Sequence, residues 1–146
     1  MLTDKDTMVV ELKRRCVPVL RRLGFKGSFP HLYRVRDAHV DLLNFQFYSA
    51  GGSFCINLSY ADPKRANIYI YKDTEPKKLR VNQATVRHRL GAVHAGADNW
   101  FSYGETSYGE NRGKPVPPTE LCLTINQLLE TCAESWWNTR KIENES

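Results

Sequence analysis

Amide, tyrosine and arginine side chains recur at every second position along several segments, a pattern that could serve ligand binding. Amides offer hydrogen-bond donors and acceptors, and tyrosine rings offer flat stacking surfaces. If these segments are strands of one sheet, the side chains share a face. This face could bind single-stranded nucleic acid, a peptide or a small molecule, or it could be a hydrated surface held by its own contacts. Its predicted members are His31, Tyr33, Asn44, Gln46, Asn57, Ser59, Tyr69, Tyr71, Arg87 and Arg89.

The most basic part of this face is the tripeptide Arg87-His88-Arg89. On a strand the two arginines point to one side and His88 points to the other. Two neighbouring guanidinium groups suit a phosphate or a carboxylate. The alternative is that both arginines form salt bridges with nearby acidic residues. The sequence leaves both interpretations open.

No residue pattern indicates catalysis, a metal or a cofactor. The four histidines form no HExxH motif and no Cys/His zinc spacing, and His94 with Asp98 is too weak a pair to predict a metal site. The glycine-rich stretch 104–115 differs from a phosphate-binding loop, because Pro115 stands where Ser or Thr should follow Lys114. An enzyme would therefore need a site that only the fold assembles. We name no catalytic residue, metal ligand or cofactor.

The segments 43–48 and 54–60 alternate apolar and polar residues around a glycine-rich turn, which predicts an antiparallel hairpin. A turn centred on Ala50 and Gly51 matches every apolar residue with another, and a shift by one residue would destroy the match. A tight turn at 37–38 fixes the register of the preceding strand in the same way. The expected pairs are Phe47 with Phe54, Phe45 with Ile56, Leu43 with Leu58, Gln46 with Cys55, Asn44 with Asn57, Arg34 with Asp41 and Leu32 with Leu43.

Apolar residues at helical spacing predict a helix over 4–23, bent at the exposed Pro18 and closed by Gly24, and a helix over 119–140 that begins at Thr119. Between them we expect a sheet within 29–102 and a loop over 103–118. The segment 84–93 fits a strand or a helix, and we favour a strand. The other expected strands are 29–36, 39–48, 54–60, 67–71 and a short one at 99–101.

These elements predict a single α+β domain over residues 1–146. Its sheet is an antiparallel β-meander of about five strands, with the N- and C-terminal helices packed on one face. Phe45, Phe47, Phe54, Ile56 and Leu58 should be buried between the sheet and the helices. The polar face should stay open or be partly covered by the long loop.

The last helix has two apolar sides of unequal size. Leu123 and Trp137 stand opposite the main apolar arc, so we predict an exposed stripe that contacts a protein partner or a second copy of the chain. The alternative is that the long loop folds over them. The main arc comprises Leu121, Cys122, Ile125, Leu128, Leu129, Cys132 and Trp136.

The net charge of +5 is concentrated at one end, since residues 1–36 carry nine Lys and Arg against three Asp and Glu. This basic third could meet an acidic partner or could be a solvated helix face. No apolar stretch approaches the ~18 residues of a membrane helix, and the N-terminus lacks the apolar segment of a signal peptide. Widely spaced cysteines indicate no disulfide framework. We expect a cytoplasmic protein, not bound to membranes, with Cys16, Cys122 and Cys132 reduced in the core.

Several short motifs occur in an order that resembles the bacterial domain-of-unknown-function family 4304 over residues 8–102. Trp100-Phe101 departs from the double Trp expected there. The resemblance implies a small cytosolic α+β domain and no known reaction, so it supplies no catalytic residue. The motifs are Leu20-Arg-Arg-Leu-Gly24-Phe25-Lys26, Tyr33-Arg34, Asn44-Phe45-Gln46, Phe54-Cys-Ile-Asn-Leu58, Arg87-His-Arg-Leu90-Gly91 and Asp98-Asn-Trp100.

The sequence favours a non-enzymatic binding or protein-interaction module. The first alternative is a single-stranded nucleic-acid binder that uses the tyrosines with Arg34, Arg36, Arg87 and Arg89. The second alternative is an enzyme whose site is assembled by the fold.

Overall fold

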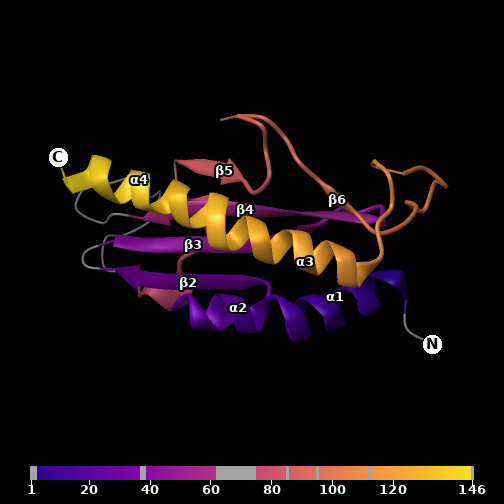
Figure 1. The fold of residues 1–146 in the computed structure, drawn as a ribbon, viewed down its shortest axis with the longest axis horizontal. Coiled ribbons are helices and arrows are strands. Elements are labelled where there is room, and N and C mark those ends of the chain that lie inside the picture. Colours follow the sequence, from indigo (N-terminus) through magenta and orange to yellow (C-terminus); the bar gives the residue numbers. More distant parts are fainter. Residues whose placement is uncertain are drawn as a thin grey trace.

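The computed structural model describes residues 3–36, 39–61, 75–84, 86–94, 96–111 and 113–145. It confirms the α+β fold, in which helices from both ends of the chain cover one face of an antiparallel sheet (Figure 1). The predicted strand 67–71, with Tyr69 and Tyr71, lies outside the described residues. Among those residues no helix is both long enough and apolar enough to span a membrane.

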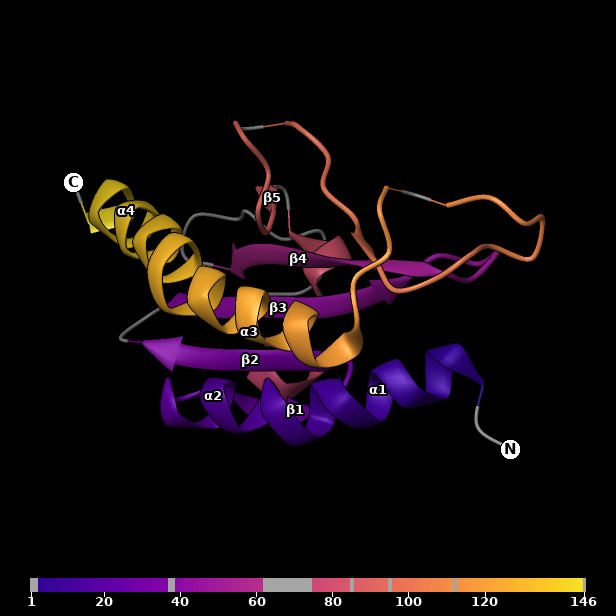
Figure 2. The same cartoon turned by 45° about the vertical axis from the view of Figure 1, so that its right-hand side comes forward.

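The helices are α1 (Asp4–Arg15), α2 (Val17–Arg22), α3 (Pro118–Leu128) and α4 (Glu134–Glu145), with a π-helical turn η3 (Leu129–Ala133) and the 3-10 turns η1 (Pro76–Lys78) and η2 (Val81–Gln83). The strands are β1 (Lys26–Ser28), β2 (His31–Arg36), β3 (His39–Phe47), β4 (Ser53–Ala61), β5 (Arg87–Arg89) and β6 (Phe101–Ser102). Figure 2 shows α1 and α2 running beside β2, and α3 crossing in front of the sheet and continuing toward α4.

Within the described residues the strand order is β1-β2-β3-β4-β5, and β6 pairs with the start of β4. The expected register is confirmed throughout β2, β3 and β4, including Arg34 opposite Asp41, Phe45 opposite Ile56 and Asn44 opposite Asn57. The ambiguous segment 84–93 contains the short strand β5, as favoured. The first strand begins at His31 rather than at residue 29, and β1 is an additional strand.

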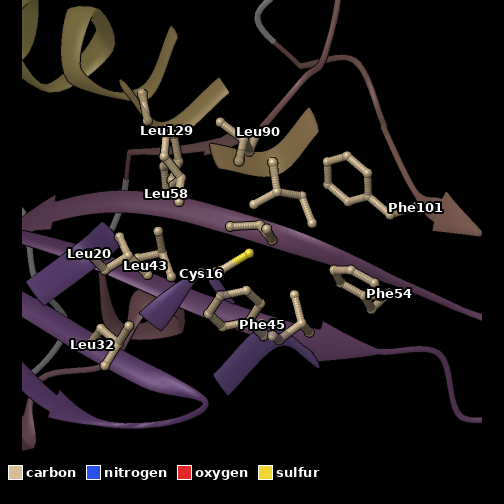
Figure 3. Close-up of a cluster of buried hydrophobic side chains, with 14 of the residues drawn as sticks. Cys16, Leu20, Leu32, Leu43, Phe45, Phe54, Leu58, Leu90, Phe101 and Leu129 are labelled. Atoms are coloured by element: carbon tan, nitrogen blue, oxygen red, sulfur yellow. The ribbon is translucent and has the colours of Figure 1, made fainter. Parts of the chain in front are cut away.

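The main core lies between the sheet and the helices, where side chains from distant parts of the chain meet (Figure 3). Four of the five predicted core residues are buried, and Phe47 is half-buried at the margin. Cys16 and Leu20 contribute to this core from the N-terminal helices, and Leu129 contributes from the last helical segment. The buried members of the hairpin are Phe45, Phe54, Ile56 and Leu58.

The predicted N-terminal helix is broken into two at Cys16. Pro18 has no N–H to donate to the carbonyl of Arg14, and it stands in the first turn of α2, where that donor is not required. Cys16 still donates its N–H to Leu12 and accepts from Leu20, so the two helices remain almost continuous. Gly24 closes α2 with a φ of 98°, as expected for a helix C-cap.

The π-helical turn η3 changes the face that the end of the last helix presents to the sheet. A π turn contains one extra residue, so every later residue is rotated by about 100° relative to an uninterrupted α-helix. Ala133 therefore takes the core position expected for Cys132, and Trp137 takes the position expected for Trp136. Cys132 is exposed and Trp136 is half-buried.

The prediction that Trp137 is exposed is therefore wrong, since its exposed fraction is 0%, whereas Leu123, which precedes the π turn, is 66% exposed. Trp137 packs on Phe25, with ring centroids 5.1 Å apart, and its Nε1 donates to the carbonyl of Ser59 at 2.9 Å. Thr119 is also not the N-cap: the helix begins at Pro118, because proline suits a first turn.

A second, smaller apolar cluster covers one end of the polar face of the sheet. Val40, Leu42 and Ala61 of β3 and β4 pack there against Leu79 and Val81. Among the described residues, the segment that covers this end is thus 75–84, which contains η1 and η2, rather than the long loop 103–118. The other end of the polar face is left for the amides.

We expect Trp137→Ala to lower the free energy of unfolding by roughly 3–5 kcal/mol, as for other large core aromatics. Trp136→Ala is the matched control, with a smaller expected loss because that side chain is half-buried. Urea unfolding of both variants measures the difference. If Trp136→Ala is the more damaging substitution, the last helix follows the uninterrupted α-helical phase and the π turn is wrong.

Candidate functional site on the polar face of the sheet

A pocket of about 310 Å³ opens on the polar face, and we refer to it as the sheet-face pocket. Side chains of β3 and β4 form its base, η2 forms one wall, and β5 with the following loop forms the other. These elements lie far apart in the sequence but meet because β5 pairs with β4 and η2 packs on the same face. The pocket is lined by Asn44, Gln46, Asn57, Val81, Asn82, Arg87, His88, Arg89, Gly96 and Ala97.

Five of the predicted ligand-binding residues thus converge on one pocket: Asn44, Gln46, Asn57, Arg87 and Arg89. Tyr33 is not among them. It packs against the second apolar cluster and lines a separate hollow with Lys26 and Lys77. Ser59 is also unavailable, because it is fully buried and donates its hydroxyl to the carbonyl of Val86.

Three amides form the base of the pocket, and we call Asn44, Gln46 and Asn57 the amide floor. Asn57 lies in the middle, and its Nδ2 donates to Asn44 Oδ1 at 2.8 Å and to Gln46 Oε1 at 2.9 Å. The buried thiol of Cys55 lies 3.9 Å from both Gln46 Oε1 and Asn57 Oδ1. The floor is therefore a connected row whose orientation is set by Asn57.

The two arginines of β5 have different surroundings. Arg89 forms a salt bridge with Asp98, and its guanidinium group lies over the ring of Trp100 at 5.3 Å. Asp98 also accepts from Trp100 Nε1 at 2.9 Å, so these side chains hold one another. Arg87 is exposed and makes no ion pair with any described residue. The salt-bridge interpretation therefore holds for Arg89, while Arg87 offers its full charge to the pocket.

A second cavity of about 580 Å³ adjoins the sheet-face pocket and shares Asn44, Gln46 and Asn82 with it. Its far side is formed by His31 and Arg80. Burial, together with the positive charge of Arg80, lowers the pKa of His31, and its Nδ1 is buried without a hydrogen-bond partner in the described part of the chain. At neutral pH this wall therefore carries the charge of Arg80 and a neutral imidazole.

Sequence reasoning missed the wall formed by Arg80, Val81 and Asn82. The available signal was the alternation of apolar Leu79 and Val81 with polar Arg80 and Asn82, which is typical of a segment lying on a surface. That signal does not identify the face of the sheet on which the segment lies.

On the opposite face, Arg34 and Arg36 belong to a buried charged cluster and not to the polar face, which corrects their expected role in nucleic-acid binding. Arg34 Nε donates to Asp41 Oδ2 at 2.9 Å and Arg34 Nη1 donates to Glu134 Oε1 at 2.8 Å. Arg36 Nε and His39 Nε2 approach the same carboxylate at 2.7 and 3.2 Å. Alternation along β2 gives this result, because Arg34 and Arg36 point away from Tyr33.

This cluster has the residue types of an active site but is closed by its own contacts. Asp41 is fully buried and is contacted by Arg34, Arg36 and His39. The guanidinium group of Arg34 also lies over the rings of Phe25 and Trp137, at 4.6 and 5.3 Å from their centroids. The arrangement joins the sheet to the last helix and leaves the carboxylate of Asp41 inaccessible to a substrate.

Among the described residues, no group of three or more His, Cys, Asp or Glu is placed to hold a metal ion. The four cysteines are present as thiols rather than disulfides, and Cys16, Cys55 and Cys122 are buried. A hydrogen bond to Cys122, together with burial, raises the pKa of the Cys16 thiol, so that group stays protonated.

A family model described as a domain of unknown function (DUF4304) matches residues 16–138, which is most of the chain. The match begins at residue 16 rather than at residue 8 and continues past residue 102, so it includes the sheet-face pocket and Trp137. No curated protein and no solved structure matches the sequence. The match assigns neither a reaction nor a ligand.

Removing a carboxylate should lower the free energy of unfolding more in the buried charged cluster than beside the wall of the pocket. Asp41→Ala should cost roughly 3–5 kcal/mol of unfolding free energy, because it leaves buried guanidinium groups without their partner. Asp98→Ala removes the partner of Arg89, but its carboxylate side chain is 64% exposed, so a loss of about 1 kcal/mol or less is expected. Thermal or urea unfolding measures both. Equal losses would contradict the structural role given to the cluster of Asp41.

Proposed function

The chain belongs to the DUF4304 family of domains of unknown function, and from that premise we propose that it is a non-enzymatic binding module whose sheet-face pocket takes a negatively charged ligand. The observation that carries the proposal is the convergence on one pocket of the amide floor and of Arg87, which forms no ion pair with any described residue. An uncompensated guanidinium group beside hydrogen-bonding amides is the usual means of recognising an anionic group. A cytoplasmic setting in a bacterium is part of the proposal, and the presence of the cysteines as thiols supports a reducing compartment.

The residue types in the pocket support binding over catalysis. Its described lining consists of amides, arginines, one histidine and small or apolar residues, and it includes no carboxylate, hydroxyl or thiol. Nucleophilic or acid–base catalysis requires a nucleophile, or an acid or base such as histidine, that is held in place by a partner. The ring of His88 stacks on Trp136 at 5.7 Å, which assigns it to packing at the edge of the sheet.

Single-stranded nucleic acid is the second candidate, and the adjoining cavity favours it. The two cavities share part of the amide floor and have Arg80 at one end and Arg87 at the other. An extended polyanion needs such a succession of cations and hydrogen-bonding groups along its path. Interaction with a protein partner or a second copy has lost the support of Trp137, since that residue is buried, and only Leu123 remains of the stripe.

The pocket should bind a mixed-sequence single-stranded oligonucleotide at low salt if the second candidate holds, with affinity falling as salt rises through counterion release. Arg87→Ala should weaken this binding and lower the slope of log affinity against log salt by about 0.7, the value for one phosphate contact. Arg89→Ala should have less effect because Asp98 already neutralises that residue. Fluorescence anisotropy of a labelled oligonucleotide measures both quantities.

The matched control is Arg14→Ala, which removes the same charge from the exposed side of α1, away from the pocket. If Arg14→Ala and Arg87→Ala weaken the oligonucleotide equally, binding is a general effect of net charge. If the oligonucleotide does not bind at low salt, and neither inorganic phosphate nor acetate binds in a calorimetric titration, the proposed function is wrong.

A further inference from the structure

Asn57 occupies the one position from which a single amide sets the polarity of the whole amide floor. Its Nδ2 lies between the side-chain oxygens of Asn44 and Gln46, at 2.8 and 2.9 Å, and donates to both. An amide nitrogen only donates, so each neighbour must turn its oxygen toward Asn57. The thiol of Cys55 is compatible with this arrangement, since its one hydrogen can be donated to either Gln46 Oε1 or Asn57 Oδ1, each 3.9 Å away.

The consequence appears on the other side of each neighbouring amide. Once the oxygens of Asn44 and Gln46 accept from Asn57, their NH₂ groups are directed away from it. No described residue accepts a hydrogen bond from Asn44 Nδ2 or Gln46 Nε2. Both side chains line the sheet-face pocket and the adjoining cavity. The floor therefore presents N–H donors where the two cavities meet.

Arg87 adds further hydrogen-bond donors at the wall of the sheet-face pocket. A guanidinium group carries N–H donors and no acceptor. A ligand group placed between the floor and Arg87 thus meets donors from two sides together with one positive charge. A group that offers only acceptors and a negative charge satisfies all of them, whereas an ammonium or other donor group leaves them unpaired.

We propose that Asn57 is a positioning residue that makes the sheet-face pocket a site for an oxyanion, whose oxygens accept hydrogen bonds from the side-chain amides of Asn44 and Gln46 and from Arg87. The inference rests on the proposed function and adds the chemical class of the ligand and the residue that selects it. A phosphate group and a carboxylate share this chemistry. Separate titrations with inorganic phosphate and with acetate distinguish these two sources.

The first test uses the unaltered protein. In nitrogen–proton NMR spectra, addition of inorganic phosphate should shift the side-chain NH₂ signals of Asn44 and Gln46. The NH₂ signals of Asn57 should move less, because its hydrogens are already donated within the floor. A general change in stability or charge would not select these two amides.

The second test reverses the direction of the hydrogen bonds within the amide floor. In Asn57→Asp the carboxylate only accepts, so Asn44 and Gln46 must turn their NH₂ groups toward it and their oxygens toward the pocket. Asn82→Asp is the matched control: it adds the same charge at the wall of the pocket without a hydrogen bond to the floor. We expect phosphate affinity to fall about 30-fold or more in Asn57→Asp and roughly fivefold in Asn82→Asp.

Each outcome of these tests supports or overturns the inference. A larger loss for Asn57→Asp, with the selective NMR shifts, supports it. If phosphate or acetate binds but both variants lose the same affinity, or the Asn44 and Gln46 signals stay fixed, the role of Asn57 is overturned and the proposed function stands. Should Asn57→Asp not fold, the NMR titration of the unaltered protein decides alone. If phosphate, acetate and the oligonucleotide all fail to bind, the proposed function itself is wrong.

Discussion

The pairing of β3 with β4 is the constraint on which both faces of this protein depend. Side chains alternate along each strand, so one register places Phe45 and Ile56 under the helices and Asn44 and Asn57 on the opposite face. A shift by one residue would bury the amides and expose the aromatic rings. The core and the candidate site are therefore two results of the same set of backbone hydrogen bonds, and neither exists without the other.

On the helix-covered face, the position of the last helix is set by a charge pair and by a change of helical phase. Arg34 joins Asp41 on the neighbouring strand to Glu134 at the start of α4, and its guanidinium group also covers Trp137. The π turn directly before Glu134 rotates Ala133 and Trp137 toward the sheet. Buried ion pairs gain little over apolar contacts, but a mispositioned helix would leave these charges unpaired, so the pair penalises other placements.

On the opposite face, the segment 75–84 divides the sheet into two regions. Leu79 and Val81 cover the end that carries Val40 and Leu42, and the remaining end holds the amide floor between η2 and β5. The hydrogen bonds of Asn57 consume acceptors within the floor, and Asp98 neutralises Arg89 but not Arg87. The polarity of the pocket thus follows from which groups are already satisfied, and not from the number of polar residues that line it.

Alternation and turn chemistry were enough to predict the α+β class, the register of three strands and five residues of the candidate site, because these are local properties of period-two segments. The pairing of Arg34 with Asp41 followed from the same register. Helical spacing predicted the wrong face for the end of the final helix, because one extra residue in the π turn η3 leaves no mark in the spacing of side chains and yet moves Trp137 from the surface to the core.

Contacts between distant segments could not be predicted from the sequence for a related reason. The packing of η2 against β3 and the pairing of Arg89 with Asp98 depend on where loops return in space, and several placements are compatible with the same local pattern. The sequence by itself determined which side chains share a face of the sheet, because strand geometry forces that result. Only the tertiary structure decided which of them remain unsatisfied and available to a ligand, because that depends on partners contributed by the rest of the chain.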